Sequence, residues 1–473
     1  APALGRSRNA QRAVSIGTLA AVAAIAVGLL VRVDADGPAA LASGGWEAPV
    51  GITLVADRLA AIMLVVAVLM LLFVLLYAVG QPGAEDRHVG FHPVYLVLAA
   101  GVSLAFLTGD LFNLFVAFEV TLMASYVLIT LGGRRDQVRS GMTYVVLSLV
   151  ASALFLLALA FTYAATGTLN MADLGSKIAE LPDGVRSGLA VLLIVVFGIK
   201  AAIFPLFFWL PDSYPTAPSP VTAVFAGLLT KVGVYALIRS QTVLFPPETQ
   251  PGTLLLVVAA LTMAVGVLGA IVQDDVKRIL SFHIVSQIGY MVMGLALFDL
   301  AGLAGTVFYL VHHIIVKTTL FLVAGLVEQR AGSTALARLS GLIRAEPVLA
   351  VMFLLPALSL AGIPPFSGFV AKLALVDAGL GAGAYAVVGV SLAVSLLTLY
   401  SMTKIWASTF WGPLEHPPIP PLNRIRRSLM LGSTGVLVLL SLVVAGAAEP
   451  LYALAERAAE DLVSADAYRA VVL

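Results

Sequence analysis

Eight ionisable side chains lie inside long apolar stretches of this 473-residue sequence, and they are the first candidates for chemistry. The set comprises one acid, four lysines and three histidines: Glu119, Lys200, Lys231, Lys317, Lys372, His283, His312 and His313. Placing a charged group in hydrocarbon costs about 2.5 to 3.5 kcal/mol on insertion scales, so such groups are rare unless they have a function. We therefore interpret these residues as a proton-translocation site.

Proton transfer along such a set has a simple physical basis. A lysine stripped of water releases its proton more readily, whereas a nearby carboxylate helps it to keep the proton. A change in the distance between Glu119 and Lys200 would thus switch Lys200 between the two states. His313 and Lys317 are four residues apart and share a helix face, and imidazole can accept and donate protons in turn. A relay through intervening waters would then follow the row Lys200, Lys231, His313, Lys317 and Lys372.

Several of these residues also have a structural alternative. His283 could be a packed, hydrogen-bonded histidine, and Lys317 could merely join two helices. Lys404, a fifth lysine in an apolar segment, lies two turns from a helix end and can extend its amine to the membrane surface. Three further charged residues lie near the ends of predicted helices and fit a boundary role: Asp57, Arg58 and Asp110.

The composition indicates the class of protein that must position these groups. Apolar residues make up 60% of the chain and charged residues only 11%, whereas about 25% of a soluble domain is charged. A net charge of +1 argues against a nucleic-acid binder, and the absence of cysteine excludes a disulfide scaffold or a thiolate metal site. The sequence contains no phosphate-loop, dinucleotide-binding or zinc-protease motif. We expect neither a metal nor a cofactor.

A membrane-spanning helix needs about 20 mostly apolar residues, because its backbone polar groups must be paired within the segment. None of the connecting stretches is large enough for a catalytic domain, so we expect a transporter subunit and not an enzyme. Short amphipathic helices are expected at 168–181 and 449–473. The sequence predicts an all-α polytopic membrane protein with thirteen spans: 12–32, 54–79, 92–108, 110–131, 138–166, 187–209, 220–240, 253–273, 276–298, 301–327, 346–376, 383–409 and 428–447.

The basic residues of the loops predict the orientation, because Lys and Arg are enriched on the cytoplasmic side. Fifteen fall on the side of the N-terminus: Arg6, Arg8, Arg12, Arg87, Arg134, Arg135, Arg139, Lys277, Arg278, Arg330, Arg338, Arg344, Arg424, Arg426 and Arg427. Seven fall on the other side: Arg32, Arg58, Lys177, Arg186, Arg239, Arg457 and Arg469. The asymmetry predicts a cytoplasmic N-terminus.

Two of the spans contain helix-breaking prolines, Pro205 in the sixth and Pro364 with Pro365 in the eleventh. Broken helices at mid-membrane are typical of ion sites in transporters. Because the broken spans are five apart and five is odd, we predict two inverted five-helix repeats. The expected units are N-terminal helices at 1–91, a first repeat at 92–240, a second at 253–409, and a C-terminal helix and tail at 410–473. The proline-rich segment 211–220 is expected to be rigid and mostly extended.

Three segments resemble a known family. They are TGDLFNLFVAFE (108–119), GIKAAIFPLFFWLPDSYPTAPSPVTAVFAGLLTKVGVYALIR (198–239) and DDVKRILSFHIVSQIGYM (274–291). These segments resemble the antiporter-like subunits that respiratory complex I shares with the multisubunit Mrp cation/proton antiporters. The first and third segments, the lysine of the broken eleventh span and the chain length are most similar to the D-type members of the Mrp group.

This resemblance implies a fold of fourteen helices with two inverted repeats, so a first helix is expected to precede the thirteen seen here. It implies one half-channel around Glu119 and Lys200, a central relay through Lys231, and a second half-channel around Lys372. His313 and Lys317 match polar positions of the family's eleventh helix, which precedes its second broken helix.

The resemblance also implies a function. The chain would carry protons in a Na⁺/H⁺ antiporter of a bacterial inner membrane, with no cofactor in this subunit and with other antiporter subunits and the lipid bilayer as partners. Because no cluster of carboxylates or carbonyl-lined site for Na⁺ stands out in the sequence, we expect Na⁺ to be handled elsewhere. The alternatives are a proton-pumping subunit of a complex I-like redox complex and a silent scaffold.

Overall fold

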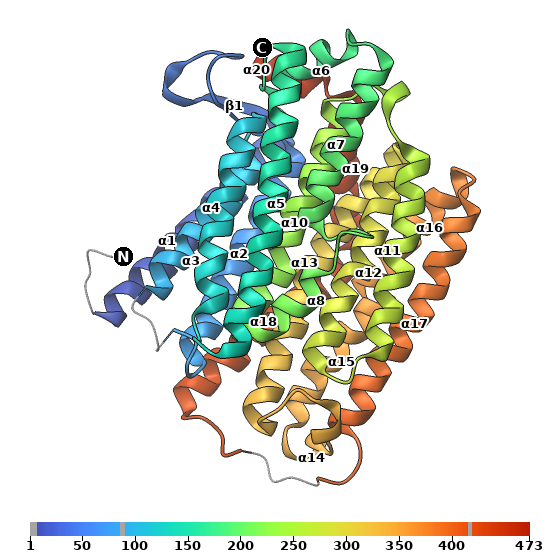
Figure 1. Cartoon of the computed structure of the whole chain (residues 1–473). Helices are drawn as coiled ribbons and strands as arrows, with labels where there is room; N and C mark the ends of the chain where they lie inside the picture. Colours follow the sequence, from blue (N-terminus) through green and yellow to red (C-terminus); the bar gives the residue numbers. More distant parts are fainter. Residues whose placement is uncertain (1–6, 86–89, 415–418) are drawn as a thin grey trace.

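The computed structural model describes residues 7–85, 90–414 and 419–473, and within them the chain forms a bundle of long, roughly aligned helices (Figure 1). Arg6 and Arg87, which entered the prediction of orientation, lie outside the described residues. The all-helical polytopic fold predicted from the sequence is confirmed.

The long helices follow one another with short connections. They are α1 (Arg8–Asp36), α2 (Arg58–Gly80), α3 (Phe91–Leu107), α4 (Leu111–Thr130), α5 (Arg135–Thr166), α7 (Asp183–Ala201), α9 (Ser219–Val224) continued by the π-helical turn η4 (Phe225–Leu229) and α10 (Thr230–Val243), α11 (Gly252–Val272), α12 (Val276–Leu297), α13 (Leu300–Ala331), α15 (Pro347–Ala361), α16 (Ser367–Gly381), α17 (Tyr385–Phe410) and α18 (Arg424–Gly446). Shorter elements are the hairpin β1 (Ala39–Ala42) and β2 (Thr53–Ala56), α6 (Met171–Ala179), α8 (Trp209–Ser213), α14 (Leu342–Ala345), α19 (Ala448–Ser464) and α20 (Asp466–Val472).

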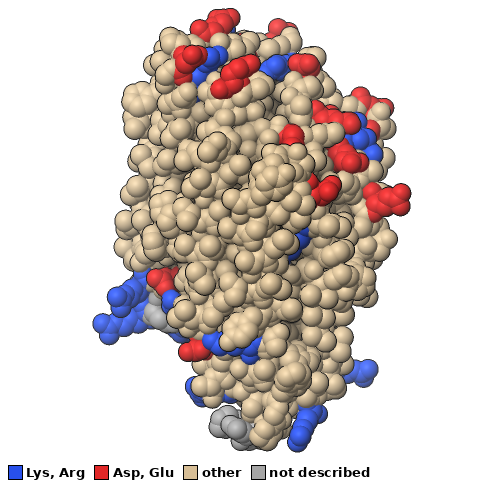
Figure 2. Space-filling view, turned by 90° about the vertical axis from the view of Figure 1, so that its right-hand side faces the viewer, with Lys and Arg blue, Asp and Glu red and all other residues tan. Residues whose placement is uncertain are grey.

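Eleven helical segments in the described part of the chain are long and apolar enough to cross a membrane. The 17-residue α3 and the pair α15–α16, which is interrupted by a break, account for the other two predicted spans. Lys and Arg gather at the lower end of the molecule in Figure 2, whereas most Asp and Glu lie at its upper end. By the positive-inside rule the lower end faces the cytoplasm, and we call it the inner end and its opposite the outer end.

Aspartates fix where several helices begin. The side chains of Asp57, Asp110, Asp275 and Asp299 each accept a hydrogen bond from the backbone amide three residues later. Such a cap pairs one of the amides that the first helical turn leaves without a partner. Glycine in the left-handed conformation ends α5 and α13, at Gly167 and Gly332.

The helices α4 and α5 recur in α12 and α13 with one constant offset. Both helix starts and the end of the longer helix lie 165 positions after their counterparts, and so do the capping aspartate and the closing glycine: Leu111 and Val276, Arg135 and Leu300, Thr166 and Ala331, Asp110 and Asp275, Gly167 and Gly332. Each capping aspartate also forms a β-bridge 60 residues on, Asp110 to Asn170 and Asp275 to Ala335. The match supports a duplicated unit, although the proposed limits 92–240 and 253–409 stay a prediction.

Two breaks interrupt the bundle where the prolines lie. α7 ends at Ala201, and Pro205 lies in the non-helical stretch that follows; Pro364 and Pro365 lie between α15 and α16. The first residue of each break, Ala202 or Gly362, has a positive φ, of 63° and 87°. The expectation of a mostly extended segment at 211–220 is wrong: α8 and a 3-10 turn fill most of it, and α9 begins at Ser219.

α13 forms the centre of the bundle. It packs against α2, α9, α12, α15, α16, α18 and α19, and nearly all of its residues from Gly302 to Val327 are buried. Its 32 residues span about 48 Å at 1.5 Å per residue. Polar groups on this helix therefore lie among other helices and not in lipid.

Charged pairs tie the C-terminal helices to the outer end. Arg239 of α10 binds both carboxylate oxygens of Asp57, at 2.5 and 2.7 Å, and its guanidinium lies over the ring of Tyr468 in α20. Arg58 binds Asp461 of α19 at 2.8 Å. Asp57 lies at a helix boundary as expected, because it caps α2, but it is only 1% exposed and so belongs to a buried ion pair instead of facing water.

Removing one member of this buried pair should be costly. We expect Arg239→Met to lower the free energy of unfolding by about 3 to 5 kcal/mol, because Asp57 keeps a buried charge without a partner. The double variant Asp57→Asn with Arg239→Met should lose clearly less, since asparagine still caps α2. Thermal unfolding of the purified protein measures both; equal losses in the two variants would contradict this account.

Candidate functional site

Glu119, Ser152 and Lys200 form a cluster where α4, α5 and α7 meet. The Ser152 hydroxyl donates a hydrogen bond to a carboxylate oxygen of Glu119 and accepts one from Lys200 Nζ at 3.3 Å. The carboxylate and the ammonium are thus joined through a serine, whereas the sequence suggested a direct effect of one on the other. Nothing in the local sequence marked Ser152, because its role depends on how α5 is rotated against its neighbours.

The break after α7 positions Lys200, which is the penultimate residue of that helix. Trp209 Nε1 donates to the carbonyl of Ile199 at 3.0 Å and so pairs a carbonyl that the ended helix leaves free. Gly233 of α10 allows close approach, because a Cβ there would lie 2.7 Å from the carbonyl carbon of Lys200.

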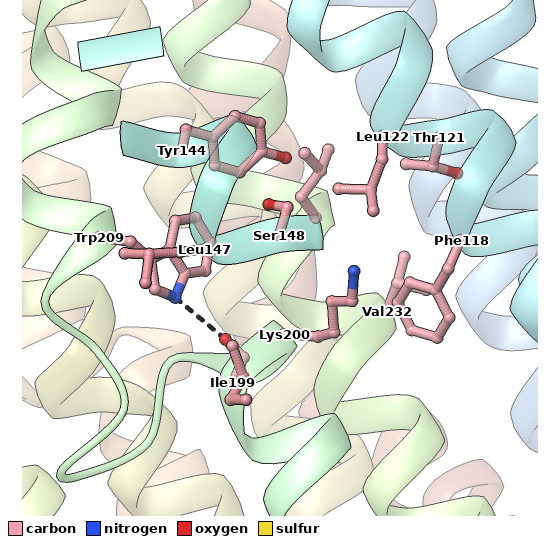
Figure 3. A pocket seen from close by; sticks show the side chains of 11 residues that line it. Phe118, Thr121, Leu122, Tyr144, Leu147, Ser148, Ile199, Lys200, Trp209 and Val232 are labelled. Carbon is pink, nitrogen blue, oxygen red and sulfur yellow. Dashed lines mark hydrogen bonds between the residues drawn. The ribbon is translucent and has the colours of Figure 1, made fainter. Parts of the chain in front are cut away.

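A small cavity adjoins this lysine, lined in part by Phe118, Tyr144 and Ser148. The Lys200 amine points into it, as Figure 3 shows, and lies 5.6 Å from the centroid of the Phe118 ring. Glu119 itself is partly exposed on the outward face of α4. The first cluster therefore reaches from the surface of this subunit to its interior.

Lys231 lies in the wholly buried segment formed by α9, η4 and α10. Its Nζ donates to the carbonyl of Ala226 at 2.6 Å and to the hydroxyl of Thr230 at 3.2 Å. Ala226 lies in the π-helical turn η4, which interrupts the regular pairing of backbone groups in the helix, and such turns occur frequently at functional sites. The sequence placed Lys231 correctly in a helix but did not reveal this turn.

His313 and Lys317 both belong to α13. Each of them interacts electrostatically with Lys231 of α10. Lys317 Nζ donates to the carbonyl of Leu280 in α12 at 3.1 Å. Neither ring nitrogen of His313 has a hydrogen-bond partner among the described residues, although the ring is fully buried. This part of the site therefore combines two lysines bound to carbonyls with an imidazole that has no hydrogen bond to the described residues.

The second cluster surrounds Lys372 in α16. Its Nζ donates to the carbonyl of Ala361, the last residue of α15, at 3.1 Å, and lies 4.9 Å from the centroid of the Tyr290 ring. Tyr290 stacks on Tyr309 with centroids 5.4 Å apart, and Tyr309 lies one turn from His313. Two stacked phenol rings thus separate Lys372 from the central histidine, a feature that no sequence signal predicted.

His312 also lies at the break between α15 and α16, but its partner is a hydroxyl group and not the carbonyl that binds Lys372. Its Nδ1 is hydrogen-bonded to the hydroxyl of Ser367 at 2.9 Å, and the Ser367 hydroxyl lies 3.2 Å from that of Ser359. The structure therefore separates the adjacent histidines: His312 points to the hydroxyl groups at the break, and His313 to Lys231.

His283 and Lys404 have the contacts expected of residues with a structural role. His283 Nε2 is hydrogen-bonded to Ser401 at 2.5 Å, as a packed histidine would be, although it lies within electrostatic range of Lys317 and Lys372. Lys404 reaches the inner end, where it binds Asp274 at 2.9 Å and the carbonyl of Gln273 at 2.7 Å. This is the membrane-surface contact expected for Lys404.

The buried amines of this arrangement bind neutral partners. Among the described residues no group of three or more His, Asp or Glu side chains could hold a metal ion. Lys231, Lys317 and Lys372 are each bound to an uncharged backbone carbonyl. An amine in such a setting can lose its proton without leaving a carboxylate buried and unpaired.

Comparisons with known proteins identify the family of this chain. Residues 108–398 match the family described as NADH:quinone oxidoreductase/Mrp antiporter, TM. A relative from Alkalihalophilus pseudofirmus, named as the D subunit of a Na(+)/H(+) antiporter, is 44% identical over 472 residues, which cover 99% of this chain and 95% of the relative.

Two solved structures share the fold. A chain of the Mrp complex from Dietzia sp. DQ12-45-1b superposes with a TM-score of 0.93 and 35% identity, covering 100% of this chain and 96% of that one. A chain of an archaeal membrane-bound sulfane sulfur reductase gives a TM-score of 0.89 at 27% identity, covering 98% and 94%. The chain therefore belongs to the NADH:quinone oxidoreductase/Mrp antiporter transmembrane family.

The serine bridge can be tested directly. We expect Ser152→Ala to lower proton transport roughly tenfold or more, because hydrogen bonds to charged groups contribute about 1.5 to 3 kcal/mol each. Ser152→Thr should retain most of the rate, since it keeps the hydroxyl. The rate of ΔpH dissipation in membrane vesicles is the measurement.

A control for this variant is Ser103→Ala, because the Ser103 hydroxyl bonds only the carbonyl of Ala99 in its own helix. Wild-type transport by Ser152→Ala, at equal amounts of assembled protein, would remove the bridge from the site.

Proposed function

We propose that this chain is the proton-translocating subunit of a multisubunit Na⁺/H⁺ antiporter in a bacterial inner membrane. Protons pass through the buried site residues and water near the middle of the membrane, and Na⁺ crosses elsewhere in the complex. The relative's name and the Mrp complex structure support this proposal. The single observation that carries it is the set of buried amines that bind neutral partners along one row of helices.

The row gives each residue a role. Glu119 and Lys200 form the first half-channel, with Ser152 between them. Lys231, with His313 and Lys317 across the helix interface, forms the central relay. Lys372 ends the row in the second half-channel, next to the hydroxyl groups bound to His312. His283 adjoins the row between Lys317 and Lys372.

Other subunits are the proposed partners, and Glu119 supports this. A partly exposed glutamate on the apolar side of α4 that faces away from the bundle would meet lipid in the isolated chain, which is costly. A neighbouring subunit that covers this face of α4 removes the cost.

The alternative is a proton-pumping subunit of a redox complex. The family includes such proteins by its description, and the archaeal reductase shares the fold at 27% identity. The two functions differ in what drives transport. Na⁺-dependent dissipation of ΔpH without an electron donor supports antiport, whereas acidification that requires an electron donor supports the alternative.

The central amine provides the decisive variant. We expect Lys231→Ala to abolish Na⁺-dependent ΔpH dissipation in vesicles while the complex still assembles, because the proposed relay then lacks its proton-binding group at the midpoint. Glu119→Ala should behave likewise. Glu119→Asp should keep partial activity, since the charge remains but lies further from Ser152 and Lys200.

Assembly is followed by co-purification of the other subunits. If Lys231→Ala and Glu119→Ala both transport at the wild-type rate, the chain is a scaffold and the proposed relay is wrong.

A further inference from the structure

A large polar depression lies at the inner end of the bundle, away from the clusters described above. Its free volume is about 1320 Å³, and loops after α2, α4 and α8 form its walls together with the inner ends of α12 and α13. Charged and polar side chains line much of it, among them Arg134, Asp212, Ser219, Lys277, Arg278 and Glu328. A depression of this size and polarity on the cytoplasmic side holds water.

The ion pair between Lys277 and Glu328 is more buried than the pair between Arg278 and Asp212, which also lines this depression. Lys277 Nζ of α12 binds Glu328 Oε2 of α13 at 2.6 Å, and the hydroxyl of Ser219 donates to the same oxygen at 3.1 Å. The Lys277 side chain is 5% exposed and that of Glu328 is 36% exposed. The carboxylate therefore faces the water while the amine lies behind it.

We propose that this depression is the inner aqueous mouth of the central relay, and that Glu328 is the group that takes up protons there and passes them toward Lys317. The inference rests on the proposed function. Lys277 and Ser219 are positioning residues that hold the carboxylate at the mouth.

The helices α12 and α13 connect the mouth to the relay. The carbonyl that binds Lys317 belongs to Leu280, which lies three residues, or about 4.5 Å along the helix axis, from Lys277. On α13, Lys317 and Glu328 are eleven residues apart, which is close to three full turns, so both lie on one face about 16 Å apart. The two long side chains shorten that gap from both sides.

Hydroxyl groups occupy the layer between them. Tyr77 Oη donates to the carbonyl of Leu322 at 3.0 Å, and Ser281 Oγ donates to that of Lys277 at 2.8 Å. Glycine at position 325 leaves room for Tyr77 and Ser219, since a Cβ there would lie 2.5 Å from Tyr77 Oη and 2.6 Å from Ser219 Cβ. This layer therefore offers polar steps where a continuous apolar plug would block a proton.

The charges around Glu328 are mixed. Lys277 contacts it from α12, and the hydroxyl of Tyr77 lies within its electrostatic range from α2. The depression adds cations and carboxylates: Arg134, Arg278, Asp212 and Asp275. The carboxylate is thus held near cations without being enclosed by them, and it stays open to the water of the depression.

The competing interpretation is a clamp that only joins α12 to α13. To separate the two, we would measure ΔpH dissipation in everted vesicles, whose outer face is the cytoplasmic one. We expect Glu328→Gln to lower the rate at least tenfold with normal assembly, and Glu328→Asp to keep a substantial part of it. Formate, a small carboxylic acid, should partly restore Glu328→Ala but not Lys231→Ala, because it can replace the carboxylate at the mouth, whereas passive permeation of formic acid would act on both variants alike.

A matched control is Asp274→Asn. Asp274 also binds a lysine at the inner end, Lys404 at 2.9 Å, but lies outside the lining of the depression. Its variant should transport at the wild-type rate. Wild-type transport by Glu328→Gln alongside an inactive Lys231→Ala would overturn this inference and leave the proposed function intact; failure of formate would favour the clamp and also overturn it.

Accessibility gives a second test that does not depend on activity. Because the chain contains no cysteine, Glu328→Cys introduces a single thiol into this subunit. A membrane-impermeant thiol reagent should modify it from the cytoplasmic face and not from the outer face, as a mass shift of this subunit would record. Absence of modification from the cytoplasmic face would overturn the proposal of an aqueous mouth.

Discussion

The need to find a partner for every buried amine governs this structure. An ammonium group in a low-dielectric interior is stable only with hydrogen-bond acceptors around it. Three of the buried lysines use backbone carbonyls: Lys231 that of Ala226, Lys317 that of Leu280, and Lys372 that of Ala361. Two of these carbonyls lie where the regular helical ladder is interrupted, in a π-helical turn and at a break. The irregular backbone is therefore part of the site, because it solvates charge without adding a fixed counter-charge.

The duplicated architecture places unlike residues at equivalent positions. Ser152 on α5 and Lys317 on α13 are related by the same 165-residue offset that relates the ends of those helices. In the first half a small hydroxyl at this position joins a carboxylate to a lysine; in the second half a lysine fills it and binds a carbonyl. Divergence at one register position thus separates a half with an acid–base pair from a half that relies on amines and histidines.

The sequence predicted those features of the site that are energetically unfavourable unless they have a function, such as charged side chains inside membrane spans. Buried charges, apolar spans and the prolines of the two breaks are local signals, and each led to a correct placement in the helices. What could not be predicted depends on the rotation and packing of segments far apart in the chain. Ser152, Glu328 and the burial of Asp57 acquire their meaning from partners 33, 51 and 182 positions away. The helical turns at 211–220 were missed because proline spacing does not distinguish an extended loop from short helical turns.

The outer-end ion pairs bear on how such a chain is made in the cell. Arg239 meets Asp57 from an earlier helix, so its charge can be neutralised as soon as α10 leaves the ribosome and enters the membrane. The contacts of α19 and α20 with Arg58 and Arg239 are formed by residues that are synthesised after the helices α1 to α18. Synthesis of the core thus precedes closure of its outer end, which α19 and α20 complete with further charged contacts.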